Sequence, residues 1–192
     1  MLNTLRENYN KNNINITPEF KKDINSFLTF IPHFNGVTFI DKRPVQATIE
    51  LDACLTGMGA RYDNAVYAYK FTGVPQTYLI VHLEMINILA ALRVWGSCWA
   101  NKKIIIKCDN QAVVSVLNTG KSRDPQLCAI ARNIFMYIAL NDINLIVLHV
   151  LGSNNTVADL LSRWTGSEQD VSTLYQHVDN PVCLTFTANT YT

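Results

Sequence analysis

Four carboxylates stand where a metal-dependent hydrolytic site would need them: Asp52, Glu84, Asp109 and Asp159. Asp52 and Asp109 each follow an apolar, strand-like run, whereas Glu84 and Asp159 lie in segments with helical periodicity. Four anions brought together would repel one another, and divalent cations would remove that penalty. Mg²⁺ takes carboxylate oxygens and water as ligands. A pair of such ions about 3.5–4 Å apart can hold the attacking and the leaving oxygen of a phosphodiester.

Each carboxylate also has an ordinary structural explanation when it is taken alone. Asp52 would suit a turn, Asp109 with Asn110 a helix cap, and Asp159 the solvated face of a helix. Glu84 is different because apolar residues flank it, and a buried carboxylate needs a partner. Taken together, the four residues favour a shared metal site. Glu50 shares a strand face with Asp52, and we expect it at a solvent-facing or edge position.

The elements that must position these residues alternate between strands and helices. The expected strands are 45–52, 59–62, 65–71, 104–108 and 143–150, and the expected helices are 82–97, 110–118, one beginning at Pro125, and 156–163. The order βββαβααβα predicts an α/β domain, with a mixed five-stranded sheet and helices on both faces. The run 104–108 is almost entirely apolar, which predicts a central strand buried on both faces. Ligands bind where strands end and helices begin at one edge of such a sheet, so we expect the carboxylates to meet there.

Composition indicates a folded globular domain with flanking segments. Of 192 residues, 48% are hydrophobic and 16% charged. We expect the main domain at 45–164. Residues 1–44 would form an N-terminal tether or connection segment with one amphipathic helix that starts at Thr17-Pro18. Residues 165–192 lose periodicity and would form a C-terminal tail or linker.

Charge, cysteines and hydropathy narrow the setting. The net charge of +1 does not by itself indicate a nucleic-acid binder, although a modest basic group surrounds the third carboxylate: Lys102, Lys103, Lys107, Lys121, Arg123 and Arg132. No apolar run predicts a membrane span or a signal peptide. The five cysteines form no C-x-x-C pair, so we expect them reduced and mostly buried, in an intracellular protein of the cytoplasm or nucleus.

The segments around the carboxylates resemble the ribonuclease H motifs of retroelement reverse transcriptases. DACLTGMGA at 52–60 resembles the first motif, Glu84 with its apolar helix the second, DNQ at 109–111 the third, and HVLGSNNTVADLLSR at 149–163 the closing motif. The resemblance covers about 120 of the 192 residues. Segments 52–57 and 120–125 together are most similar to tyrosine-recombinase retrotransposons of the DIRS type.

The resemblance implies a ribonuclease H-like fold, and an endonuclease that hydrolyses the RNA strand of RNA/DNA hybrids during reverse transcription. The four carboxylates would bind two Mg²⁺ ions, for which Mn²⁺ would substitute. One ion would activate water, and the other would stabilise the leaving 3′ oxygen. The resemblance also implies a reverse transcriptase polymerase domain in the same polyprotein, with residues 17–40 similar to the connecting segment, and no membrane partner.

Further positions are implied to contact the substrate. Asn110 and Gln111 match positions that touch the minor groove of the hybrid. The backbone near Thr56 and Gly57 would face the RNA strand, whose 2′-hydroxyls distinguish RNA from DNA. Two residues of the closing loop, Ser153 and Asn155, complete the expected substrate contacts.

The sequence departs from the cellular enzymes of this family in two places. They carry a histidine in a longer loop before the last aspartate, whereas 152–155 is short and lacks one; His149 is expected on the preceding strand. No asparagine pair precedes Glu84, since Ile80-Val81-His82 stands there. Trp95 and Trp99, one helical turn apart, are expected to pack rather than to stack on bases.

Two other functions remain open. A 3′–5′ exonuclease of related fold would require D-x-E on the first strand, which Asp52-Ala53-Cys54 does not supply. A catalytically idle, ribonuclease H-like scaffold beside a polymerase would not need to bind Mg²⁺, so a metal titration separates it from an enzyme.

Overall fold

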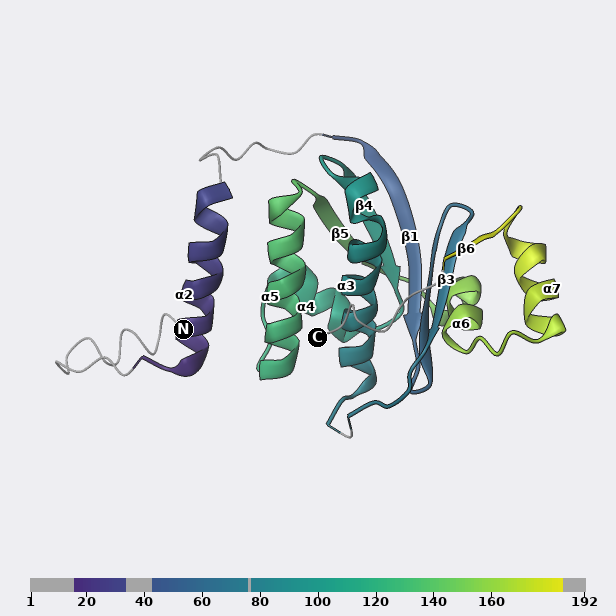
Figure 1. Ribbon diagram of the computed structural model, residues 1–192, viewed down its shortest axis with the longest axis horizontal. Coiled ribbons are helices and arrows are strands. Elements are labelled where there is room, and N and C mark those ends of the chain that lie inside the picture. Colours follow the sequence, from purple (N-terminus) through teal and green to yellow (C-terminus); the bar gives the residue numbers. More distant parts are fainter. Residues whose placement is uncertain (1–15, 34–42, 76, 185–192) are drawn as a thin grey trace. The chain divides into compact units, whose positions relative to one another are not determined.

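The computed structural model describes residues 16–33, 43–75 and 77–184, in a chain that divides into two compact units, Met1–Thr38 and Phe39–Thr192. The first unit contains helix α2 (Pro18–Phe30) and the 3-10 turn η1 (Ile31–His33) (Figure 1). The Thr17 side chain accepts a hydrogen bond from the Phe20 N–H, and Pro18 opens the helix. This is the start that the Thr17-Pro18 pair predicts.

The second unit is built on a mixed sheet with the strand order β5-β4-β1-β2-β3-β6. The strands are β1 (Val45–Ala53), β2 (Gly57–Tyr62), β3 (Ala65–Lys70), β4 (Lys103–Cys108), β5 (Asn144–His149) and β6 (Val182–Leu184). β1, β2 and β3 form an antiparallel meander, while β4 pairs in parallel with both β1 and β5. Asp52 lies at the end of β1, and Asp109 directly follows β4. Because the two strands are paired in parallel, these ends are neighbours, as expected.

Helices cover both faces of this sheet (Figure 1). They are α3 (Ile80–Trp99), α4 (Gln111–Thr119), α5 (Pro125–Leu140), α6 (Thr156–Ser162) and α7 (Glu168–His177), with the 3-10 turn η2 (Gly152–Asn154) before α6. α3, α4 and α5 pack over the larger core, whereas α6 and α7 pack over a smaller cluster on the other face. The predicted mixed sheet between two helical layers is confirmed.

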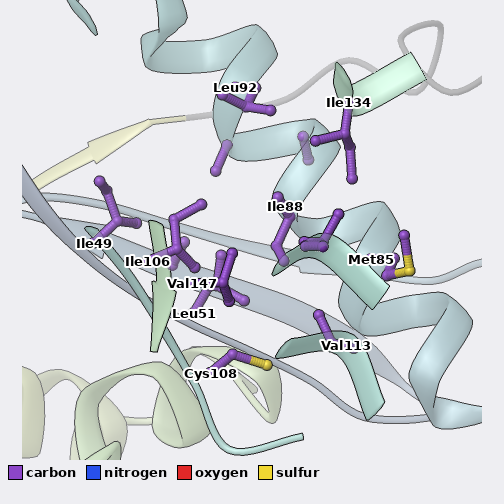
Figure 2. Packing of buried hydrophobic residues seen from close by; sticks show 14 of the residues in the cluster. Ile49, Leu51, Met85, Ile88, Leu92, Ile106, Cys108, Val113, Ile134 and Val147 are labelled. Atoms are coloured by element: carbon purple, nitrogen blue, oxygen red, sulfur yellow. The ribbon is translucent and has the colours of Figure 1, made fainter. Parts of the chain in front are cut away.

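The larger core joins alternate residues of the central strands to α3 (Figure 2). Ile49 and Leu51 of β1 and Ile106 of β4 are fully buried, because side chains two apart on a strand share one face. Ile88 and Leu92 of α3 lie against them, one helical turn apart. This packing fixes α3, and therefore Glu84, relative to the ends of β1 and β4.

α3 is long and apolar enough to cross a membrane by length and composition, which the sequence pattern did not predict. However, 67% of its 18-residue apolar stretch is buried within the protein, and core helices of globular domains pass the same test. Trp95 and Trp99 are 5% and 0% exposed and contact each other and Tyr62 edge-on or tilted. Their predicted packing role is confirmed.

The sheet has six strands where five were expected, because residues assigned to a C-terminal tail or linker form α7 and β6. The Ser167 side chain caps α7 by accepting a hydrogen bond from the Asp170 N–H. Leu174 and Val178 are buried in the smaller cluster. β6 then pairs in parallel with β3. Three strand residues are too few to display an alternating pattern, so β6 could not be predicted from hydrophobic periodicity.

Two expectations about burial are wrong. β4 lies inside the sheet, yet only Ile104, Ile106 and Cys108 are buried, and the alternate residues are half-exposed. The reason is that α6 packs on β1, β2 and β3, leaving the second face of β4 more open. Of the five free cysteines, only Cys108 is buried; Cys54 and Cys128 are half-buried, and Cys98 and Cys183 are exposed.

Candidate metal-dependent active site

All four carboxylates line one cleft of about 680 Å³ at the edge where β1 and β4 end. We call it the acidic cleft; its lining residues are Asp52, Ala53, Cys54, Leu55, Thr56, Ile80, Glu84, Asp109, Asn110, Gln111, Asp159 and Arg163. The carboxylates come from four separate places in the chain: the end of β1, α3, the residue after β4, and α6. Residues up to 107 positions apart therefore meet only through the fold.

Two buried asparagines hold the strand end that carries Asp52. Asn87 Nδ2 donates to the carbonyl oxygens of Asp52 (2.7 Å) and Gly59 (2.9 Å), and Asn155 Nδ2 donates to the carbonyl of Leu51 (2.9 Å). The Tyr67 hydroxyl donates to Asn87 Oδ1 at 2.6 Å. These bonds join α3, the loop before α6 and β3 to β1. The backbone of the strand end that carries Asp52 is thereby held by three other parts of the fold.

The sequence pattern did not single out Asn87, although one signal was available: it follows Glu84 by three residues, on the same helical face. Asn155 was expected to contact substrate, but its side chain is 1% exposed and bonds to the Leu51 carbonyl. It lies outside the lining of the acidic cleft.

The other expected substrate contacts divide between the cleft and its surroundings. Thr56, Asn110 and Gln111 line the acidic cleft. Asn110 Oδ1 caps α4 by accepting from the Ala112 and Val113 N–H groups. Gly57 is buried away from the cleft, because a Cβ there would lie 2.6 Å from the Ser162 carbonyl oxygen. Ser153 lies exposed on η2 and is likewise outside the lining.

The deepest carboxylates resist ionisation in the metal-free protein. Glu84 is 2% exposed, and burial, followed by the charges of Asp52 and Asp109, raises its pKa to about 9. Burial also raises the pKa of Asp52 to about 6, opposed by a hydrogen bond with Ser162 and reinforced by Asp109 and Asp159. Both shifts have the cause expected for acids that are desolvated beside other anions.

The donor set fits a hard divalent cation. Asp52 Oδ2 is buried without a hydrogen-bond partner, a rare state for a polar atom inside a protein. Carboxylate oxygens are the ligands that Mg²⁺ prefers, and a bound cation would satisfy this oxygen and offset the repulsion among its neighbours. Asp109 lies close to Glu84, with one ligand atom of each within 4.8 Å of the other.

Asp159 is half-exposed and has a cationic partner. Arg163 Nε donates to Asp159 Oδ1 at 2.9 Å, one helical turn along, and the Asp159 side chain is 51% exposed. That hydrogen bond and the charge of Asp159 raise the pKa of Arg163. Arg163 also lines the acidic cleft. Its part in the site was missed, although its i,i+4 spacing from Asp159 was visible.

Asp109 is held from the side of β5 and η2. The His149 Nε2–H donates to the Asp109 carbonyl oxygen at 3.1 Å, from the last residue of β5. A methyl group added at Gly152 would lie 3.3 Å from Asp109 Oδ2. The short loop that lacks a histidine therefore runs directly beside this carboxylate, and His149 supports its backbone.

A histidine clasp fixes the start of α3, two residues before Glu84. His82 Nδ1 accepts from the Leu79 N–H at 2.9 Å, and the Nε2–H donates to Asp124 Oδ2 at 2.8 Å. Asp124 Oδ1 in turn caps α5 by accepting from the Gln126 N–H. Tyr78 stacks on the 1%-exposed His82 ring. The clasp ties the first turns of α3 and α5 together, in the position where the sequence lacks the asparagine pair.

Glu50 belongs to the sheet surface rather than to the acidic cleft. Its carboxylate accepts a hydrogen bond from Lys107 Nζ at 3.0 Å and lies 3.7 Å from Arg61. Its side chain is only 20% exposed between these two cations. Glu50 was expected at a solvent-facing or edge position; it lies instead on an interior strand, where the ion pairs with two neighbouring strands account for its partial burial.

The metal-free protein is expected to lose stability as the pH rises from about 4 to about 9. Glu84 and Asp52 have pKa values raised above 4.5 and 3.8, to about 9 and about 6. Between those limits the folded state binds more protons than the unfolded state, so raising the pH removes stability. Denaturant unfolding with a chelator at pH 5 and pH 8 measures the difference.

Glu84→Gln is the matched variant for this pH dependence, because it removes the titrating group and keeps the shape. Its free energy of unfolding should change less with pH than that of the wild type. Adding Mg²⁺ at pH 8 should restore the stability that the wild-type protein loses at that pH, since a ligand that binds the folded state stabilises it. Equal pH slopes for wild type and variant would contradict the assignment.

Comparison with known proteins shows the fold. No family model matches this sequence, and no curated protein matches it. The N-terminal RNase H domain of Mycobacterium tuberculosis Rv2228c, solved as a fusion with maltose-binding protein, superimposes with a TM-score of 0.50 and 20% identity, over 61% of this chain and 95% of that one.

Two further solved structures are similar. RNase H1 of the halophilic archaeon Halobacterium salinarum has a TM-score of 0.43 and 18% identity, over 60% of this chain and 91% of its own. LC11-RNase H1, isolated from compost, has a TM-score of 0.42 and 16% identity, over 60% of this chain and 89% of its own. The fold assignment rests on the first structure, together with the observed element order and mixed sheet. This chain has the ribonuclease H-like fold.

Proposed function

We propose that this protein is a divalent-metal-dependent endonuclease that hydrolyses the RNA strand of RNA/DNA hybrids. One observation carries the proposal: Asp52, Glu84, Asp109 and Asp159 reach one cleft from four separate elements of a ribonuclease H-like fold. A buried carboxylate without a compensating partner is costly. Asp52 and Glu84 are both buried, and the Asp52 Oδ2 atom has no hydrogen-bond partner, which favours a site built for cations over a structural accident.

In this proposal Asp52, Glu84, Asp109 and Asp159 hold two Mg²⁺ ions, for which Mn²⁺ can substitute. Such ions lower the pKa of bound water and stabilise charge on the leaving oxygen. The protein's own contribution is rigid placement. Asn87 and the His82–Asp124 clasp orient Asp52 and Glu84. Asp159, partly exposed on α6, would bind the cation in place of Arg163, and that guanidinium would then be available for a phosphate.

The rim of the acidic cleft supports an extended anionic substrate. Thr56, Asn110 and Gln111 supply polar groups, and Arg163 supplies a positive charge. Contacts to 2′-hydroxyls are what would select RNA over DNA. With a net charge of +1, the protein has little electrostatic attraction for a duplex. We therefore assign part of the hybrid affinity to another domain.

That domain, in this proposal, is a reverse transcriptase polymerase in the same polyprotein of a DIRS-type retroelement, working inside the cell. The support is the resemblance of segments 52–60 and 149–163 to retroelement motifs, and of segments 52–57 and 120–125 together to the DIRS type. A tethered polymerase would hold the hybrid at high effective concentration, which compensates for weak binding by the nuclease.

The deciding experiment is cleavage of an end-labelled RNA/DNA hybrid. We expect internal cuts in the RNA strand with Mg²⁺ or Mn²⁺, none in excess EDTA, and no cutting of duplex DNA or double-stranded RNA. Equal cutting of all three duplexes, or full activity in EDTA, would refute the proposal. Absence of both cleavage and Mg²⁺-induced stabilisation would identify an idle scaffold instead.

A further inference from the structure

The acidic cleft has a thiol beneath it that the proposed hydrolysis leaves unused. Cys108 ends β4, and its side chain is 0% exposed, facing the α3 side of the sheet (Figure 2). Its Sγ lies 3.7 Å from Glu84 Oε2. Single ligand atoms of Cys108, Glu84 and Asp109 all lie within 4.8 Å of one another.

These separations suit a tetrahedral soft cation. Zn–S bonds of about 2.3 Å and Zn–O bonds of about 2.0–2.2 Å place neighbouring S and O ligands roughly 3.5 Å apart. The distance between Cys108 Sγ and Glu84 Oε2 is close to that value before any adjustment. Mg²⁺, in contrast, prefers oxygen ligands and would not be stabilised by a thiol.

A second, independent observation points to a ligand at the same place. Asp52 is 6% exposed, and its Oδ2 atom is buried without a hydrogen-bond partner. Asp52 lines the acidic cleft together with Glu84 and Asp109. A cation bound beside Glu84 and Asp109 would therefore also compensate this unpaired oxygen.

We propose that Cys108, Glu84 and Asp109 form a binding site for thiophilic divalent cations such as Zn²⁺ and Cd²⁺ beneath the acidic cleft. On binding, the Cys108 S–H bond breaks, a sulfur–metal bond forms, and the proton passes to solvent. Thiolate ligands select such ions over Mg²⁺. An ion held there engages the carboxylates of Glu84 and Asp109 and blocks Mg²⁺-dependent cleavage; only this inhibition rests on the proposed function.

Cys54 provides a matched control within the same cleft. Its Sγ lies 3.1 Å from Thr56 Oγ1 and 3.2 Å from the Ser162 carbonyl oxygen, to which the thiol donates. These partners are a hydroxyl and a carbonyl, whereas Cys108 has a carboxylate beside it. Cys54→Ser should therefore leave soft-metal binding intact, and Cys108→Ser should remove it.

The first test is a Cd²⁺ titration of the full chain, followed by the ultraviolet sulfur-to-metal charge-transfer band. We expect a tight one-to-one phase in wild type and in Cys54→Ser, and its loss in Cys108→Ser. Calorimetry should show that Cys108→Ser lowers the Zn²⁺ affinity on the order of tenfold or more. Removing a residue that only supports a metal ligand already causes a loss of that size, so removing a ligand itself should cost at least as much. Mg²⁺ affinity should stay unchanged. A tight phase that survives Cys108→Ser would overturn the proposal.

The second test does not require a substitution at the buried Cys108. A variant with Cys54, Cys98, Cys128 and Cys183 replaced by serine retains Cys108 as its single thiol. X-ray absorption of its one-to-one Zn²⁺ complex should show one sulfur scatterer, and an all-oxygen shell would overturn the proposal. If hybrid cleavage occurs, Zn²⁺ should inhibit it in this variant and not in Cys108→Ser. If no cleavage occurs, the proposed function fails, and the binding results still decide the metal site.

Discussion

Asp109→Asn is expected to lower hybrid cleavage by about 10³-fold or more while the fold is retained. The substitution keeps the shape of the side chain and removes a negative charge that cations in the acidic cleft would require. Losing one group that stabilises charge in a transition state typically costs about 10²–10³ in rate, and a metal ligand is expected to lie at or above that range. Single-turnover cleavage of a labelled hybrid at saturating Mg²⁺ measures the effect.

The same substitution should leave the metal-free protein as stable as wild type or slightly more so. Asp109 is one of the charges that raise the pKa values of Asp52 and Glu84, so removing it relieves repulsion. Asp179→Asn is the control, because Asp179 is exposed and lies outside the acidic cleft. It should retain full activity. An active Asp109→Asn enzyme would remove Asp109 from the site, and a large loss of stability would attribute its effect to folding.

Gly59→Ala is expected to destabilise the protein by about 1–3 kcal/mol or more, the usual cost of overpacking. A Cβ at Gly59 would lie 2.3 Å from the Leu161 Cβ and 2.7 Å from the Ser162 backbone nitrogen. Backbone cannot rotate away as a flexible side chain can, so α6 must move off β2. The melting temperature should fall by roughly 2–12 °C for a chain of this size.

Gly59→Ala should also reduce cleavage, because α6 carries Asp159. Gly73→Ala is the matched control: nothing lies within 4 Å of a Cβ at Gly73. That variant should keep the wild-type melting temperature and activity. A Gly59→Ala protein with unchanged stability would mean that α6 does not pack against β2 as closely as the structure indicates.

Local patterns in the sequence determined most of the elements and the position of each carboxylate within its element. Thr17-Pro18, Asn110, Gly120 and Asp124-Pro125 act through neighbouring backbone groups, so their effects are visible in a few consecutive residues. The same holds for Asp52 at a strand end and Glu84 in an apolar helix. The resemblance of four ordered motifs added the expected fold, which the observed topology matches.

Tertiary structure decided what depends on contacts between distant segments. β6 is a strand because its backbone pairs with β3. The exposure of alternate β4 residues depends on where α6 packs. Asn155, which was expected to contact substrate, is buried and donates to the carbonyl oxygen of Leu51, 104 residues away. His82 is hydrogen-bonded to Asp124, and Cys108 lies beside Glu84. These contacts cannot be predicted from the spacing of neighbouring residues, because burial and hydrogen bonding across the assembled core stabilise them.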